Sequence, residues 1–317
     1  MDHINRYLTE EVVENYADGL IPRREALRQL GLLGMTAAIA APLLAACDTD
    51  RADTPAPTPS GGTPAGPAPL PTESIRYPGA AGRTVLGAYA AAPSPRGAVL
   101  VVHENRGLTD HVRSVAGRLA AAGYAALAVD LLSPEGGRGA FADDAAATAA
   151  LNAAPPARFV ADMRSSLDEL ARRHAATRLG AVGFCFGGGM VWSLLAAGEP
   201  RLRAAAPFYG PLPDGAAFAG SRNAAVLAVY AERDARVNAS RAAAAAALQR
   251  AGLVHEVLTF PGADHAFFND TGARYDAAAA ATAWTRLTGW FDTHLAAGPS
   301  TPGTAGTPGT PGTTPTG

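Results

Sequence analysis

The sequence predicts a single α/β domain with a mostly parallel central sheet and helices on both faces. Apolar runs of strand length alternate with longer, Ala-rich stretches of helical spacing between residues 84 and 296. Such alternation favours a parallel sheet with helices packed on it. Several runs are apolar at almost every position, which is typical of strands that are covered on both faces.

The elements follow from these runs in chain order. We expect an edge strand at 84–91 and further strands at 98–104, 124–132, 179–185, 203–210, 224–232 and 255–260. Helices are expected at 111–123, 157–175, 188–198, 240–251 and 276–296, where apolar residues recur at helical spacing. In such sheets, functional sites form at the edge where the strands have their carboxyl ends.

Composition limits the possible partners and the extent of the domain. The net charge is -2 and the pI is about 6.4, which argues against a nucleic-acid partner because such a partner needs a basic patch. Residues 48–72 are rich in Pro, Ala, Thr and Gly, as in a semi-extended tether. Residues 298–317 are mostly Gly, Pro and Thr, and we expect them to be disordered. The globular domain is therefore expected over 73–297.

The first 47 residues have the features of an export signal. A polar start carries Arg23-Arg24, and a run without charged residues, 30–46, follows and ends at Cys47. This order is typical of secretory signals. The arginine pair resembles signals of the twin-arginine route, although Pro22 before the pair departs from that pattern. The "LAAC" ending resembles the lipobox of bacterial lipoproteins, in which the cysteine receives lipid.

We therefore expect an exported protein of the periplasm or cell envelope, anchored to the membrane surface through a lipid on Cys47. The alternatives for the apolar run are an ordinary buried helix or a retained membrane anchor, since its length is near the lower limit for spanning a bilayer.

The other cysteine stands in "GFCFGG", 183–188, between a predicted strand and a predicted helix. The pattern G-x-nucleophile-x-G in that place is the nucleophile elbow of α/β hydrolases, with Cys185 where serine is usual. The following helix would present its N-terminus to the sulfur, which favours the thiolate. The alternative is a Gly-rich turn with a buried, inert cysteine.

An elbow enzyme also needs an acid and then a histidine, each after a later strand. Asp234 follows the predicted strand 224–232, and His265 follows 255–260. Glu232 could replace Asp234, and the alternatives for the pair are a capping residue and a loop histidine. Two further histidines, His103 and His111, are also expected near the carboxyl edge.

A second group of residues is expected at the same edge. Glu104 closes the first central strand. The backbone N–H groups of Asn105 and Phe186 could form an oxyanion hole beside Cys185. The alternative for Glu104 is a solvated surface group, because strand ends are often exposed.

Four segments together resemble the dienelactone hydrolase family: "HENRG", "GFCFGG", "AERDARV" and "GADHAFFND", in this order. The resemblance covers residues 80 to 295 and implies an α/β-hydrolase fold. It implies that Cys185 is the nucleophile, that His265 is its base and that Asp234 orients the imidazole. It also implies that Glu104 contacts the resting thiol and helps to activate it.

The sequence departs from the family at two positions. The best-known members carry a serine and an arginine that hold the substrate's carboxylate, and here Ala266 and Asn269 stand in those places. The resemblance therefore supports the hydrolytic machinery and leaves open whether the substrate carries a carboxylate. Family members are usually cytosolic, whereas this chain is predicted to be exported.

We expect a hydrolase that cleaves a small ester or lactone through a thioester acyl-enzyme, of the carboxymethylenebutenolidase type. No cofactor and no metal are expected, because the sequence has no Cys/His cluster with ligand spacing and no phosphate-binding loop. The alternative is a lipid-anchored binding protein that keeps the hydrolase fold without turnover. A thiol redox protein is a weaker alternative, since a C-x-x-C pair is lacking.

Overall fold

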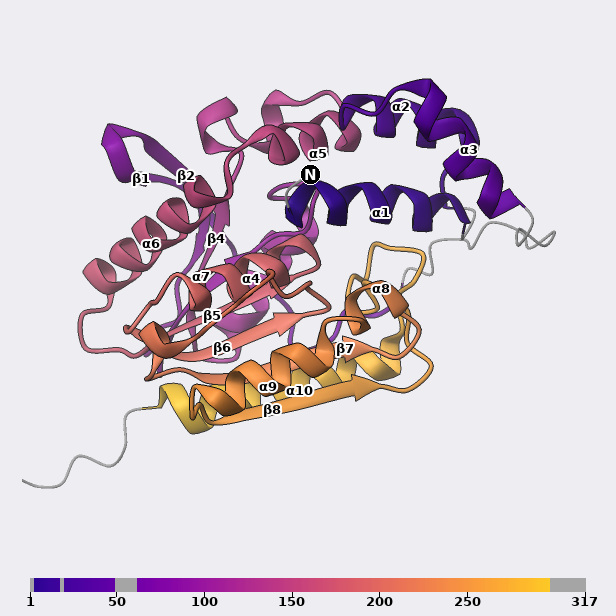
Figure 1. Ribbon diagram of the computed structural model, residues 1–317. Helices are drawn as coiled ribbons and strands as arrows, with labels where there is room; N and C mark the ends of the chain where they lie inside the picture. The colour runs from indigo at the N-terminus through magenta and orange to yellow at the C-terminus, as the bar shows by residue number, and fades with distance from the viewer. Residues whose placement is uncertain (1–2, 18–19, 49–61, 297–317) are drawn as a thin grey trace, which may run out of the picture.

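One eight-stranded sheet forms the centre of the molecule (Figure 1). The computed structural model describes residues 3–17, 20–48 and 62–296. The strands lie in the order β1-β2-β4-β3-β5-β6-β7-β8. Their bounds are β1 Glu73–Pro78, β2 Thr84–Ala90, β3 Ala98–Val102, β4 Ala125–Asp130, β5 Leu179–Phe184, β6 Leu202–Phe208, β7 Ala225–Ala231 and β8 His255–Phe260.

The sheet is parallel from β4 to β8 and antiparallel where β2 pairs with β1 and β4. Strands β3, β4, β5 and β7 are buried at every position, as their continuous apolar runs predict. The predicted fold class is confirmed.

The edge of the sheet differs from the prediction. Strand β1 is the edge, and β2, expected there, lies between β1 and β4. In β1 only Ile75 and Tyr77 are buried, because polar residues alternate with them. A short strand with this weak alternation, directly after a Pro-rich segment, is hard to recognise from sequence.

Helices cover both faces of the sheet (Figure 1). After the N-terminal segment they are α4 Asp110–Ala121, α5 Asp144–Ala153, α6 Pro156–Arg173, α7 Phe186–Ala196, α8 Ala235–Asn238, α9 Arg241–Arg250 and α10 Ala277–Leu295, with 3₁₀ turns at Ala80–Gly82, Ser133–Glu135, Arg138–Ala140 and Ala219–Ser221. The strand order reverses direction after β4, which places α4 opposite α6 and α7 because crossovers are right-handed. On the face of α4, the Arg118 guanidinium lies 6.0 Å from the Trp284 ring of α10.

Part of the predicted tether packs on the domain. The Arg118 side chain donates to the Ala65 carbonyl at 2.7 Å, and the Tyr275 hydroxyl donates to the Thr63 carbonyl at 2.6 Å. The Leu70 N–H donates to the Gly117 carbonyl at 3.0 Å. The segment thus binds the domain through its backbone groups, and its Ala65 side chain is buried. Residues 49–61 of the tether and the predicted disordered tail 298–317 lie outside the described residues.

The predicted export signal folds as three helices, α1 His3–Ala17, α2 Arg23–Leu32 and α3 Ala37–Asp48. Helix α1 packs on α2, α3 and α5 and lies along the carboxyl edge of the sheet (Figure 1). The apolar run 30–46 is split between α2 and α3, with Gly34 in a left-handed conformation between them. Among the described residues, no helix combines the length and the apolar character that crossing a membrane requires.

Candidate active site

Cys185 lies in a tight turn between β5 and α7, at φ 57° and ψ -121°. Such a conformation is strained for a residue with a side chain. The neighbouring glycines permit it, because a Cβ on Gly183 would lie 2.1 Å from the Gly187 carbonyl oxygen, and one on Gly187 would lie 2.3 Å from the Val102 oxygen. The Cys185 N–H is held by the Phe208 carbonyl at 3.1 Å. The turn has the geometry of the predicted elbow.

Three predicted residues meet at this turn. Asp234 follows β7, and its Oδ2 lies 2.5 Å from Nδ1 of His265, which follows β8. The second carboxylate oxygen accepts the Val237 N–H at 3.0 Å. The Cys185 sulfur lies within 4.8 Å of a His265 ring nitrogen. All three side chains are buried, so the imidazole is held between a carboxylate and a thiol with little access to water.

The electrostatics of the group follow from this burial. Burial lowers the pKa of the His265 imidazole, but the charge of Asp234 and the Cys185 sulfur outweigh it and raise that pKa well above its usual value. Burial raises the pKa of the Asp234 carboxyl, but the facing imidazole and Arg236 bring that pKa below its ordinary value. Burial, and next the charge of Glu11, raise the pKa of the Cys185 thiol. Burial and Glu11 thus favour the neutral thiol, and the Asp234 carboxylate makes the His265 imidazole a stronger base for the thiol proton.

The other predicted site residues lie around the same group. Glu104 is buried, and its Oε2 accepts a hydrogen bond from Asn269 at 2.6 Å. Phe186 is the first residue of α7, so its N–H has no acceptor within the helix. Asn105 lines the same cavity as Cys185. The structure thus brings Glu104 and Asn105 to the cavity that Cys185 lines.

Three alternatives from the sequence have other partners. The Glu232 carboxylate accepts the Gly262 N–H at 2.7 Å, so Asp234 is the acid that meets His265. The His103 ring donates to the Glu104 carbonyl and accepts the Leu131 N–H at 3.0 Å. His111 pairs with Asp270. Both histidines hold loops in place at the edge of the sheet.

Two residues of α1, Tyr7 and Glu11, reach the sulfur, and no sequence pattern predicted either contact. The Tyr7 hydroxyl lies 3.0 Å from the Cys185 sulfur and 3.5 Å from Nε2 of His265. The Glu11 carboxylate lies 3.4 Å from the sulfur and accepts a hydrogen bond from the Asn105 side chain at 3.1 Å. No local motif marks these residues, because their role depends on the docking of α1.

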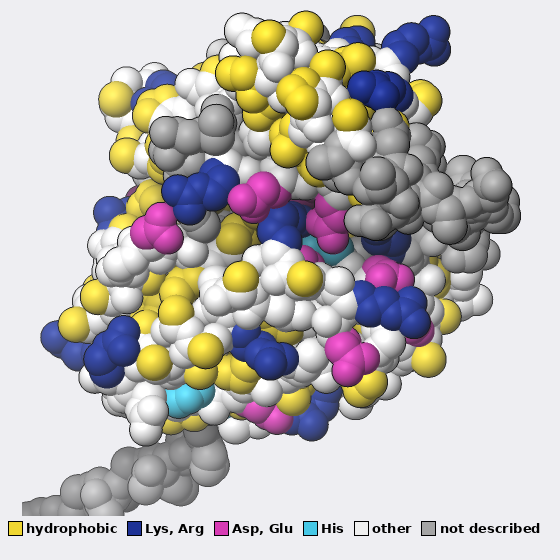
Figure 2. All heavy atoms as spheres, turned by 45° about the vertical axis from the view of Figure 1, so that its right-hand side comes forward, with side chains coloured by type: hydrophobic (Ala, Val, Ile, Leu, Met, Phe, Trp, Pro, Cys, Tyr) yellow, Lys and Arg dark blue, Asp and Glu magenta, His cyan; other side chains and the backbone are white. Residues whose placement is uncertain are grey.

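The cavity at the site has a volume of about 680 Å³. It lies between the N-terminal helices and the domain, and Cys185, His265 and Glu104 contribute to its walls together with Glu11. Figure 2 shows acidic and basic side chains gathered around a hollow of the surface. Its size suits a small-molecule ligand.

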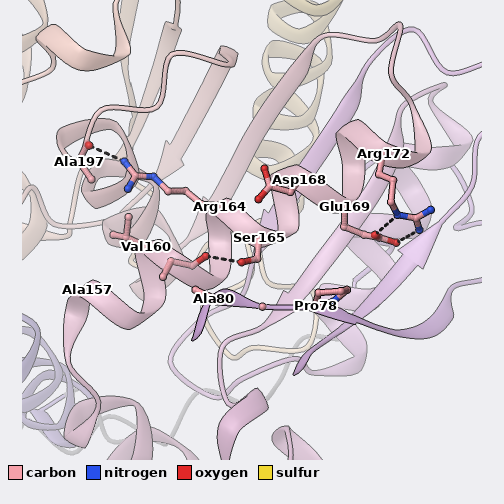
Figure 3. Close-up of a pocket in the computed structure, with 12 residues that line it drawn as sticks. Pro78, Ala80, Ala157, Val160, Arg164, Ser165, Asp168, Glu169, Arg172 and Ala197 are labelled. Carbon is pink, nitrogen blue, oxygen red and sulfur yellow. Dashed lines mark hydrogen bonds and ion pairs between the residues drawn. The ribbon is translucent and has the colours of Figure 1, made fainter. Parts of the chain in front are cut away.

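A larger cavity of about 790 Å³ lies against α6. Its lining has no cysteine or histidine. As Figure 3 shows, Arg172 is paired with Glu169, and Arg164 donates to the Ala197 carbonyl. Because the Arg172 and Arg164 side chains are engaged and no histidine lies beside the Ser165 hydroxyl in this lining, we do not assign the chemistry to it.

Comparison with known proteins agrees with this geometry. The model of the dienelactone hydrolase family matches residues 85–295. The chain belongs to the dienelactone hydrolase family. It is accordingly a hydrolase of esters or lactones.

Relatives match over most of their length. A protein of Escherichia coli (strain K12), assigned by its name as a carboxymethylenebutenolidase, is 34% identical over 220 residues, which are 64% of this chain and 81% of the relative. One of Salmonella typhi with the same name is 34% identical over 205 residues, 61% of this chain and 76% of the relative.

Solved structures of the family superpose on the same part. A crystal structure described as a dienelactone hydrolase of Klebsiella pneumoniae has a TM-score of 0.61 at 29% identity, covering 71% of this chain and 100% of that one. A dienelactone hydrolase-like promiscuous phosphotriesterase, P91, from metagenomic libraries has a TM-score of 0.58 at 26% identity and covers 72% and 99%.

The two departures from the dienelactone hydrolase pattern have structural consequences. The Asn269 amide nitrogen donates to Glu104, and its oxygen accepts the N–H and the hydroxyl of Thr271 at 3.0 and 2.7 Å. Asn269 is thus engaged within the protein. Ala266 has a φ of 62°, which shows that the backbone after His265 is strained as well.

One group of possible metal ligands occurs among the described residues: Glu11, Cys185 and His265, with ligand atoms within 4.8 Å of one another. The Cys185 sulfur is hydrogen-bonded to Glu11, and the His265 ring is hydrogen-bonded to Asp234. Hydrogen bonds therefore account for the grouping.

The elbow makes a prediction about stability. The Gly183→Ala variant should lose about 1–3 kcal/mol of unfolding free energy, because its Cβ overlaps a backbone carbonyl that cannot move aside. Urea denaturation measures this loss. The matched control is Gly289→Ala in α10, where no atom lies within 4 Å of the added Cβ and where stability should stay equal or rise. Equal stability of both variants would contradict the assigned elbow geometry.

Proposed function

We propose that the protein hydrolyses carboxylic esters or lactones with Cys185 as nucleophile, His265 as general base and Asp234 as the residue that orients the imidazole. The observation that supports this most directly is the 2.5 Å contact between Asp234 Oδ2 and His265 Nδ1 beside the cysteine of the elbow. An acid–base–nucleophile arrangement of this kind activates a weak nucleophile.

The reaction then has two halves. Nε2 of His265 takes the thiol proton, and the sulfur forms a bond to the substrate's carbonyl carbon. The carbonyl oxygen becomes an oxyanion, for which we propose the N–H groups of Asn105 and Phe186 as donors. The C–O bond to the leaving alcohol breaks as the imidazolium returns its proton to that oxygen. A lactone opens by the same step and keeps its alcohol attached.

The second half releases the acid. Nε2 takes a proton from water, the resulting hydroxide oxygen adds to the thioester carbon, and the C–S bond breaks. The sulfur recovers the proton, so the enzyme is regenerated and one water has been consumed. Asp234 stabilises the charged imidazole in both halves.

Glu104 is proposed to assist at the thiol. Its Oε1 is buried and has no hydrogen-bond partner among the described residues, and the side chain lines the cavity beside Cys185. A buried carboxylate oxygen without a donor favours a polar group of the substrate or the thiol proton as its partner.

The first test is kinetic. Cys185→Ala should lower kcat/KM for 4-nitrophenyl acetate by about 10³-fold or more, and Asp234→Asn should lower it by a comparable factor, because the residues of a triad act as a unit. The matched control is Cys47→Ser, which should keep the activity of the wild type when both are purified as unprocessed chains, because the proposed chemistry does not use the Cys47 thiol. Full activity of Cys185→Ala contradicts the proposal. A wild-type protein that binds esters without hydrolysing them, even as the processed form that begins at Cys47, would instead favour the non-catalytic binding protein.

We also propose that the protein is exported and carries a lipid on Cys47. The twin arginine, the uncharged run and the "LAAC" ending support this, as do the exposed apolar side chains of Leu32, Ile39 and Leu43 in α2 and α3. Mass spectrometry of the protein from the membrane fraction of a host with the twin-arginine route should find an N-terminal, acylated Cys47. An intact N-terminus that retains residues 1–46 would contradict it.

A further inference from the structure

We propose that α1 is an inhibitory cover, which keeps Tyr7 and Glu11 where the substrate's carbonyl group must lie, so that the full chain is a precursor of low activity. The inference rests on the proposed thiol chemistry. It adds a state of the enzyme in which the complete site is already occupied by the protein's own N-terminal segment.

Helix α1 occupies the space next to the Cys185 sulfur. A carbonyl carbon must come within about 3–3.5 Å of the sulfur to react. The Tyr7 hydroxyl at 3.0 Å and the Glu11 carboxylate at 3.4 Å already lie in that shell. Cys185 is 1% exposed and His265 is 2% exposed. Although Cys185 contributes to the wall of the neighbouring cavity, a substrate in that cavity has little room at the sulfur until α1 moves.

Helix α1 also contacts the proposed general base, His265. The Tyr7 hydroxyl lies 3.5 Å from Nε2 of His265, the atom that must take the proton from the thiol or from water. Burial, together with the charges of Cys185 and Glu11, raises the pKa of the Tyr7 phenol well above its usual value. Tyr7 thus stays protonated and cannot serve as a base in place of His265.

The charge of Glu11 also disfavours the thiolate form of Cys185. Burial raises the pKa of the Glu11 carboxyl, but His265 and Arg236 bring that pKa below its ordinary value, so Glu11 carries a negative charge. This charge faces the sulfur and, after burial, is the main cause of the raised pKa of the Cys185 thiol. A neutral thiol is a much weaker nucleophile than a thiolate.

The contacts of Glu11 resemble those of a bound carboxylic acid. One oxygen faces the sulfur and the other accepts the Asn105 amide. The Arg236 guanidinium lies 3.8 Å from Glu11, donates to Glu14 at 3.0 Å and stacks 4.3 Å from the Tyr7 ring centre. The helix therefore places a carboxylate where an ester hydrolase would hold its acid product.

The part of the chain that matches the family does not include the cover. The family match spans residues 85–295, and the Klebsiella pneumoniae chain is covered completely by 71% of this one. The processing that we propose ahead of Cys47 would remove α1 and α2 and most of α3. Export of a folded precursor, followed by this cleavage, would expose the thiol only after export.

The experiment uses the full chain with a specific protease site inserted within 49–61, outside the described residues. The native protein is cut, and the N-terminal fragment is separated by gel filtration. Alkylation of Cys185 by iodoacetamide, followed by peptide mapping to distinguish it from Cys47, and hydrolysis of 4-nitrophenyl acetate are compared before and after cutting. Both rates should rise about tenfold or more, as expected when a minor open state becomes the only state.

A double variant in the uncut chain provides a second test. Tyr7→Ala with Glu11→Ala should also raise the alkylation rate of Cys185. The matched control is Arg6→Ala with Glu10→Ala, whose side chains are exposed on the same helix and whose loss should change nothing. A peptide of residues 3–17 should inhibit the cut enzyme, and its Glu11→Gln form should inhibit it less.

Each outcome separates the cover from the proposed function. Faster alkylation without any ester hydrolysis supports the cover and contradicts the hydrolase mechanism. Hydrolysis and alkylation that are equal before and after cutting, in fully separated samples, overturn the cover and leave the mechanism standing. Activity that falls on cutting also overturns the cover, because α1 would then contribute to catalysis.

Discussion

The backbone conformation of Cys185 is the constraint on which the rest of the site depends. A residue with a side chain at φ 57° and ψ -121° costs of order 1–3 kcal/mol, and it persists only where its surroundings enforce it. Here Gly183 and Gly187 remove the atoms that would collide, and the Phe208 carbonyl holds the cysteine N–H. The sulfur is consequently presented at the carboxyl edge of the sheet instead of within its core.

Burial then decides the electrostatics. Asp234 and His265 are almost inaccessible to water. Burial disfavours the charged form of each group, and the other group favours it. The same low-dielectric surroundings make the nearby Glu11 effective against the thiolate, because a charge at this range is weakly screened. One arrangement can thus support catalysis when the cleft is open and suppress it when α1 is docked. The difference between the two states is the position of a single helix.

Sequence patterns predicted the features that depend on residues close together in the chain. The strand runs, the elbow and the order of Asp234 and His265 follow from residues close together in the chain. The family resemblance already favoured Asp234 over Glu232, and the contact of Asp234 with His265 agrees with that choice. The docking of α1 could not be predicted from the sequence, because Tyr7 and Cys185 are 178 positions apart and no pattern in either segment indicates their contact. The export-like composition of residues 1–47 also favoured a reading in which the segment does not pack on the domain. The predicted contact of Glu104 with the thiol depended on the family, whereas in this structure the carboxylate that bonds to the sulfur is that of Glu11.

The central claim is that the Cys185 sulfur becomes covalently bonded to the acyl group of the substrate. Its most direct test is peptide mass spectrometry after acid quenching of the cut protein within its first turnovers of 4-nitrophenyl acetate. The account predicts an acetyl mass on the peptide that contains Cys185, removable by neutral hydroxylamine as a thioester is. Sustained hydrolysis with an unmodified Cys185, or with the acetyl group on another side chain, would contradict it.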